Sequence, residues 1–257
     1  MKVAFFNGIS MSGDVSKYMA AIGVILAQEY NCRVVLGSNY ISNHMLQDCF
    51  SGKIKEEGIA HAPYRFLYGS QEYSSDLWNM KRNRQGDILE IPMEGVTIIF
   101  PPDADKKCMF YYNVPQTSFY LLDMAEENRT IFQAVIEEAD WLVVFLPQDV
   151  DQIHKFFHRF SSLIPKAIVV IEEAQRANRL FYRKIVAEYG IKNKNIGSIP
   201  KNKEFRDACE EGKMEAFLKK IKATKNPQYS FLSGTRGIAR ILYERNVQGR
   251  TKESEEN

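Results

Sequence analysis

The residues best placed to do chemistry lie near the N-terminus, in the segment NGISMSGDVS that follows the apolar run KVAFF. Gly8 and Gly13 are separated by four residues, as in the phosphate-binding pattern G-x-x-x-x-G-K-[ST]. Such a loop directs backbone N–H groups and the positive end of a helix at an anion. Here Asp14 stands where the pattern has its lysine, and Val15 where it has the hydroxyl that binds Mg²⁺. The segment predicts a phosphate loop without the side chains of ordinary phosphoryl transfer.

Two interpretations of this loop remain open. In the first, backbone N–H groups and nearby hydroxyls bind a nucleotide against the repulsion of the Asp14 carboxylate, which costs roughly a few kcal/mol if the carboxylate is desolvated. The candidate nucleotide-binding residues are then Gly8, Ser10, Ser12, Gly13, Asp14, Val15 and Ser16. In the second, the segment is a plain turn in which a Ser or Asp caps the following helix.

Apolar runs that alternate with amphipathic segments predict the elements that position this loop. The predicted strands cover 2–6, 32–38, 96–100, 118–123, 140–147, 166–171 and 195–200, and the predicted helices cover 17–30, 127–139, 149–163, 174–189 and 231–247. Between 51 and 95, Gly, Pro and charged residues interrupt every periodic pattern, so short helices and irregular turns are expected. This order predicts an α/β fold with a mainly parallel, doubly wound sheet covered by helices on both faces.

Three segments resemble the ParA, MinD and TadZ proteins, whose deviant phosphate loop has the form K-G-G-x-G-K-T. The segment EEADWLVVFLPQDV resembles that family's strand ADxVVVVxxP. The segment FYLLDMAEEN resembles its Walker B strand and places Asp123 where an acid orients Mg²⁺ through water. The segment IGSIPKNKEFRDACEEGK resembles the stretch beside the adenine, so that Pro200, Lys201 and Asn202 would line the base.

The resemblance implies a P-loop NTPase-like fold, ATP or ADP with Mg²⁺ as ligand, and a homodimer. It also implies a spatial organiser or scaffold in bacterial partition, localisation or pilus assembly, together with a partner protein of that system. Ile9 and Asp14 stand at the two lysines of the deviant loop, which predicts nucleotide binding that is weak or without efficient hydrolysis. The alternatives are an active ATPase that uses Ser16 or Lys17 instead, and a DNA-binding adaptor.

The adaptor alternative depends on a basic segment. Between Arg176 and Arg206 there are nine basic residues and two acidic ones. Arg176, Arg179 and Arg183 fall at helical spacing on one face, and together with Lys184 they could follow the phosphate backbone of nonspecific DNA. A merely solvated helix surface is the other interpretation.

Composition sets the remaining limits. With 257 residues, 45% apolar and 26% charged, the chain can form a single α/β domain over 1–247, followed by a polar and flexible tail over 248–257. The formal net charge of +2 provides no bulk attraction to nucleic acid or acidic membrane. The sequence has neither a signal-peptide pattern nor a transmembrane segment, which predicts a cytoplasmic protein. Its four cysteines, Cys32, Cys49, Cys108 and Cys209, lack the spacing of a metal site or a disulfide framework and predict reduced thiols.

Overall fold

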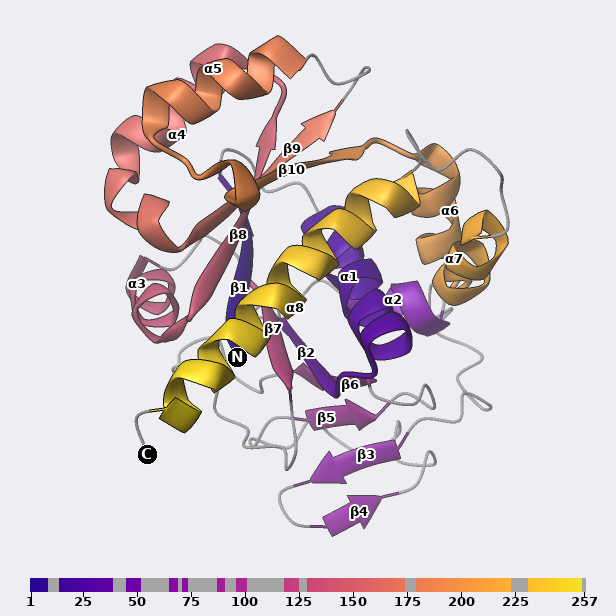
Figure 1. Cartoon of the computed structure of the whole chain (residues 1–257). Coiled ribbons are helices and arrows are strands. Elements are labelled where there is room, and N and C mark those ends of the chain that lie inside the picture. The colour runs from indigo at the N-terminus through magenta and orange to yellow at the C-terminus, as the bar shows by residue number, and fades with distance from the viewer. Residues whose placement is uncertain are drawn as a thin grey trace.

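A computed structural model of the chain describes most of its residues. The described residues are 1–8, 14–38, 45–51, 65–68, 71–73, 87–90, 96–100, 118–124, 129–173, 179–222 and 231–255. They form one ten-stranded sheet with helices on both of its faces (Figure 1).

The sheet has the strand order β10-β9-β8-β1-β7-β2-β6-β5-β3-β4. The parallel part consists of β10 (Ile196–Pro200), β9 (Ala167–Glu173), β8 (Trp141–Pro147), β1 (Lys2–Asn7), β7 (Phe119–Asp123), β2 (Val34–Ser38) and β6 (Val96–Phe100). Strand β1 pairs with β7 on one side and with β8 on the other. The chain leaves β1 toward β2 and leaves β8 toward β9, so the winding direction reverses between β1 and β8. Doubly wound sheets bind ligands at such a point, outside the carboxyl ends of the strands.

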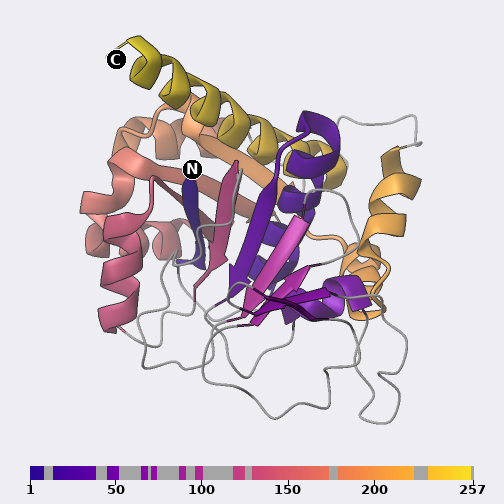
Figure 2. The same ribbon diagram turned by 90° about the horizontal axis from the view of Figure 1, so that it is seen from below.

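Alternate residues of the central strands pack into two separate cores. In β1, Val3 and Phe5 belong to one core, and Ala4 and Phe6 belong to the other. The first core is closed by α1 (Asp14–Tyr30), α2 (Met45–Ser51), α6 (Lys203–Glu210), α7 (Met214–Lys222) and α8 (Phe231–Glu255). The second is closed by α3 (Arg129–Glu138), α4 (Val150–Arg159), the 3₁₀ helix Ser161–Lys166 and α5 (Arg179–Tyr189). Figure 2 separates α3 to α5, drawn in magenta to salmon, from α6 and α7, drawn in orange at the far side of the strands. Both faces of the sheet are therefore covered, as predicted.

The C-terminal helix α8 packs on α1 and on β10 (Figure 1). Its contact with β10 requires a glycine, because a Cβ atom at Gly234 would lie 2.3 Å from the backbone oxygen of Ser198. Ile238 and Leu242 are completely buried in the same face of the helix. The described residues contain no helix with both the length and the apolarity that a membrane crossing demands. Helix α8 runs to Glu255 and so includes most of the segment 248–257 for which the sequence predicts a tail.

The region between 51 and 95 differs from the prediction. Its described residues form three short strands, β3 (Arg65–Tyr68), β4 (Gln71–Tyr73) and β5 (Asp87–Glu90), so the expectation of short helices and turns is wrong there. The strands are antiparallel and extend the sheet from β6 through β5. Strands of three or four residues carry too few alternations for a period to be recognised, and their order comes from backbone hydrogen bonds to a neighbouring strand.

Candidate functional site

The candidate site lies at the carboxyl ends of β1, β8, β9 and β10, where α1 begins. Gly8 directly follows β1, and its backbone N–H donates to the carbonyl of Phe145 at 3.0 Å. Helix α1 begins at Asp14. The segment 9–13 lies outside the described residues, and with it Ser10, Ser12 and Gly13 of the predicted nucleotide-binding set. Of the loop itself, the structure therefore describes the two ends.

Gly8 is required by packing. A Cβ atom at this position would lie 2.6 Å from both Leu146 Cδ2 and Phe156 Cδ2. Both of these side chains are buried, so neither can move aside without disturbing the second core. The glycine that the loop pattern identifies is thus explained by the contact between β1, β8 and α4, whether or not an anion binds beside it.

We predict that Gly8→Ala lowers the free energy of unfolding by about 1–3 kcal/mol, because the added methyl group overpacks a closed core. Equilibrium urea unfolding followed by circular dichroism measures the change. The matched control is Gly237→Ala in α8, where a Cβ atom would have nothing within 4 Å. This control is expected to be neutral or stabilising by up to about 1 kcal/mol, and a Gly8→Ala protein as stable as the control would refute the packing explanation.

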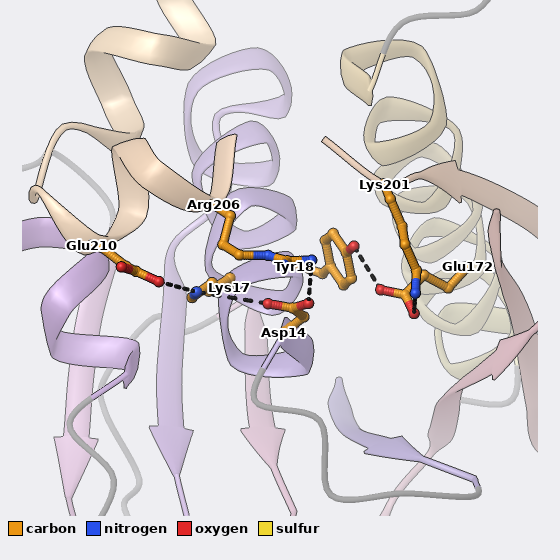
Figure 3. Close-up of polar contacts among 7 residues, drawn as sticks. All are labelled: Asp14, Lys17, Tyr18, Glu172, Lys201, Arg206 and Glu210. Carbon is orange, nitrogen blue, oxygen red and sulfur yellow. Dashed lines mark hydrogen bonds and ion pairs between the residues drawn. The ribbon is translucent and has the colours of Figure 1, made fainter. Parts of the chain in front are cut away.

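Asp14, at the position of the pattern's lysine, is neutralised by the chain's own cations (Figure 3). Its two carboxylate oxygens lie 3.1 Å from Arg206 Nη2 and 3.6 Å from Lys17 Nζ. Lys17 Nζ also lies 3.4 Å from Glu210 Oε1. Lys17 is 8% exposed and Asp14 21%, so water screens their interaction only in part. These four residues, which we call the charge network, carry two positive and two negative charges and join the first turn of α1 to α6.

Sequence reasoning missed the charge network. Asp14 and Lys17 are three residues apart, and Arg206 and Glu210 are four apart, so each pair shares one face of its helix. These spacings were the available signal. The two helix faces meet because α6 packs on α1, and residue spacing within each helix does not predict that packing.

Ser16 and Asp123, two residues that the sequence identifies separately, are brought together. The Ser16 hydroxyl donates to Asp123 Oδ2, and the Asp123 carboxyl is 1% exposed. Burial raises the pKa of Asp123 from 3.8 to about 7, while hydrogen bonds from Ser16 and from the backbone N–H of Met124 partly oppose this rise. Val15 is also buried, at 5% exposure, and carries no hydroxyl. Near neutral pH, Asp123 is therefore divided between its protonated and ionised forms.

Glu172, at the carboxyl end of β9, contacts the segment that is predicted to line the base. Lys201 Nζ lies 3.3 Å from Glu172 Oε2, and the Tyr18 hydroxyl donates to Glu172 Oε1 at 2.9 Å (Figure 3). The Asn202 side chain caps α6 by accepting from the backbone N–H of Phe205 at 2.9 Å, and Pro200 ends β10. Lys201 and Asn202 thus have structural partners within the chain.

Tyr18 is the functional-site residue that the sequence gave least reason to select. Its ring stacks on Phe145, with centroids 5.2 Å apart, and on Phe205, with centroids 5.9 Å apart. Burial is the largest cause that raises its pKa, followed by the charge of Glu172. It is a neutral hydrogen-bond donor that holds the Glu172 carboxylate against the aromatic part of the first core.

Mg²⁺ and a nucleoside triphosphate, the ligands that the resemblance implies, do not fit the described residues in the ordinary way. The lysine that would contact the β and γ phosphates is replaced by a carboxylate, and the Mg²⁺-binding hydroxyl by the buried Val15. The nearby cations Lys17, Arg206 and Lys201 already pair with Asp14, Glu210 or Glu172. The positive charge that a triphosphate needs is present, but it is already paired with carboxylates of the protein. The described residues also hold no group of three or more His, Cys, Asp and Glu side chains that could bind a metal ion.

Three of the four predicted nucleic-acid-binding residues lie away from this site. Arg179, Arg183 and Lys184 lie on α5, on the other face of the sheet from α1. Lys184 is exposed, and Arg176 lies outside the described residues. DNA binding by these residues stays a prediction. Two other cations of the same basic segment, Lys201 and Arg206, pair with Glu172 and Asp14.

Comparison with solved structures finds this arrangement of strands and helices in MinD and ParA proteins. No protein-family model and no curated protein matches the chain. The chain resembles MinD in the MinC:MinD cell division complex of Aquifex aeolicus, with a TM-score of 0.59, 15% identity and coverage of 95% of this chain and 96% of that one.

Two further structures agree with the first. A ParA family ATPase from Chlorobium tepidum TLS has a TM-score of 0.55 at 14% identity, covering 93% of this chain and 96% of that one. MinD complexed with Mg-ADP from Pyrococcus horikoshii OT3 has a TM-score of 0.56 at 11% identity, covering 93% and 95%. Identities this low establish the fold and leave the activity open. The chain has the fold of the MinD and ParA P-loop ATPases.

Proposed function

We propose that the chain is a ParA/MinD/TadZ-like spatial organiser or scaffold of a bacterial partition, localisation or pilus-assembly system, which binds nucleotide weakly or without efficient hydrolysis. The observation that carries this proposal is the charge network. Asp14 takes the lysine position at the start of α1, and Lys17 and Arg206 pair with it.

Electrostatics explains why this arrangement opposes phosphoryl transfer. Catalysis of that reaction depends on positive charge that neutralises the transferring phosphoryl group. A carboxylate about 4 Å from a phosphate charge costs about 4 kcal/mol at the effective dielectric constant of a protein surface. A penalty of that size corresponds to roughly a thousandfold loss of affinity. Lys17 and Arg206 offset part of this penalty, but both already pair with carboxylates of the protein, so the charge network leaves no net positive charge for the phosphate.

The scaffold part of the proposal draws on the structural resemblance. One of the similar structures is MinD in a complex with MinC. By analogy, this chain would present its own surface to a partner protein of its system, and it would do so as a cytoplasmic homodimer. Light scattering during size-exclusion chromatography tests the dimer: a mass near twice 29.7 kDa without nucleotide is expected, and a monomer at all concentrations would remove this part of the proposal.

Thermal unfolding with ATP, ADP and Mg²⁺ tests the nucleotide part. At a nucleotide concentration equal to its dissociation constant, stabilisation is only about 0.4 kcal/mol. We therefore expect a shift of at most about 1–2 °C with 1 mM Mg-ATP, and phosphate release no faster than in a protein-free blank. A shift of several degrees together with steady phosphate release would replace the scaffold by the active ATPase. Gly237→Ala, which lies outside the predicted nucleotide-binding residues and has space for a Cβ atom, is the control and should respond to nucleotide as the wild type does.

A further inference from the structure

Helices α2 and α6 meet beside the charge network through two cysteines. Cys49 lies on α2 and Cys209 on α6, and the two helices pack against each other. Both side chains are completely buried in the first core, and both are free thiols. The two thiols are hydrogen-bonded to each other. Residues far apart in the chain thus bring two thiols within reach of a hydrogen bond.

We propose that Cys49 and Cys209 form a reversible disulfide that links α2 to α6. In the forming reaction, one cysteine thiolate attacks a small-molecule disulfide R–S–S–R and releases R–SH, which leaves a mixed disulfide on the protein. The second cysteine then displaces the second R–SH as the S–S bond between Cys49 and Cys209 forms. Each cysteine loses one proton, the two protons end on the two R–SH products, and the two electrons reduce the small disulfide.

Burial makes this exchange slow in the folded protein. It is the largest cause that raises the pKa of the Cys49 thiol, and the hydrogen bond with Cys209 raises it further, while the charge of Lys17 acts in the opposite direction. Since the thiolate is the attacking species, exchange has to pass through openings of the contact between α2 and α6. A slow and specific reaction distinguishes this pair from exposed thiols, which react at once and with any partner.

The position of Cys209 connects the disulfide to the charge network. Arg206 is three residues before Cys209 on α6, and Glu210 is the next residue. These two side chains form the ion pairs of α6 with Asp14 and Lys17 at the start of α1. A covalent bond from α2 to Cys209 would hold α6 against α1 from a second side. Oxidation is therefore expected to hold the charge network in place, and reduction to let α6 separate from it more often.

The test uses the full-length protein and oxidised glutathione, without denaturant. Mass spectrometry after hours of incubation is expected to show a loss of two hydrogens per chain, and a non-reducing peptide map is expected to join the peptides of Cys49 and Cys209. The melting temperature should rise by about 5–10 °C, because the bond closes a long loop of the unfolded chain, and dithiothreitol should reverse the rise.

Three variants complete the experiment. Cys49→Ser and Cys209→Ser should each abolish the cross-link and the rise in melting temperature. Cys32→Ser is the matched control, since Cys32 is buried in the same core and its thiol donates to the carbonyl of Tyr30 at 3.5 Å. It should cross-link as the wild type does. A cross-link through Cys32 or Cys108, glutathione adducts alone, or no change in mass would each overturn the proposal, and the wild-type result decides this even if a variant does not fold.

Discussion

The Asp14→Lys protein is expected to be less stable than the wild type without nucleotide, and to be stabilised by ATP much more than the wild type is. The change places a third cation beside Lys17 and Arg206 and leaves Glu210 as the one carboxylate of the charge network. Loss of the two ion pairs and repulsion among the cations should together cost about 2–4 kcal/mol, since Lys17 is almost completely buried. A triphosphate can then replace the missing negative charge.

Thermal unfolding with and without Mg-ATP measures both effects. At a hundred times its dissociation constant, a nucleotide adds about 2.7 kcal/mol, which corresponds to a shift of roughly 5–10 °C for a chain of this size. Asp14→Asn separates the two effects, because it removes the anion without adding a cation and should give an intermediate response. Glu204→Lys reverses an exposed charge on the same α6 and should leave the nucleotide response unchanged.

Adding Val15→Thr to Asp14→Lys should increase the nucleotide response further. It supplies the hydroxyl that the phosphate-loop pattern uses for Mg²⁺. Val15 is 5% exposed, so the buried hydroxyl should cost about 1–2 kcal/mol when no ligand is bound. A double variant that folds and still shows no response to ATP would mean that the start of α1 does not accept phosphate for reasons other than charge.

The second large effect is a loss of stability between pH 4 and pH 7 that depends on Asp123. Its pKa is about 7 in the folded protein and 3.8 in the ordinary, exposed state. Between these values the folded protein keeps a proton that the unfolded chain has released, so the free energy of unfolding falls as the pH rises. The contribution is complete below about pH 4 and is lost above about pH 7, and its total is on the order of 4 kcal/mol.

Urea unfolding at several pH values measures this dependence. Asp123→Asn cannot ionise and should remove this part of the pH dependence, so that its free energy of unfolding stays nearly level where that of the wild type falls. Ser16→Ala removes a hydrogen bond that lowers the pKa of Asp123, and should extend the fall in stability to higher pH. Equal slopes for wild type and Asp123→Asn between pH 4 and pH 7 would contradict the raised pKa.

Most of the fold is readable from the sequence, because its strands are marked locally. The run DWLVVFLP predicts a strand buried on both faces, and β8 has five successive buried residues from Leu142 to Leu146. The short strands β3 to β5, at one end of the sheet, are not marked in this way. They contain three or four residues each and gain their order from pairing with one another and, through β5, with β6.

The candidate site could also be predicted only in part. The sequence shows that the phosphate loop lacks its lysine and its hydroxyl, because the positions of Asp14 and Val15 are defined by their spacing from Gly8 and Gly13. What takes the place of the lysine does not follow from that spacing. Arg206 reaches Asp14, the Tyr18 hydroxyl reaches Glu172, and Cys49 meets Cys209, each from a distant part of the chain.

The physical reason is the difference between local and long-range contacts. Spacing within one helix or strand is set by the geometry of that element, so it is contained in a few neighbouring residues. Contacts between α1, α2 and α6 depend on how their buried faces pack together on the sheet, which involves residues along the whole first core. The sequence alone shows that the loop lacks the lysine and the hydroxyl that ordinary phosphoryl transfer uses. Only the packing of α6 on α1 shows that Asp14, at the lysine position, forms ion pairs with Lys17 and Arg206.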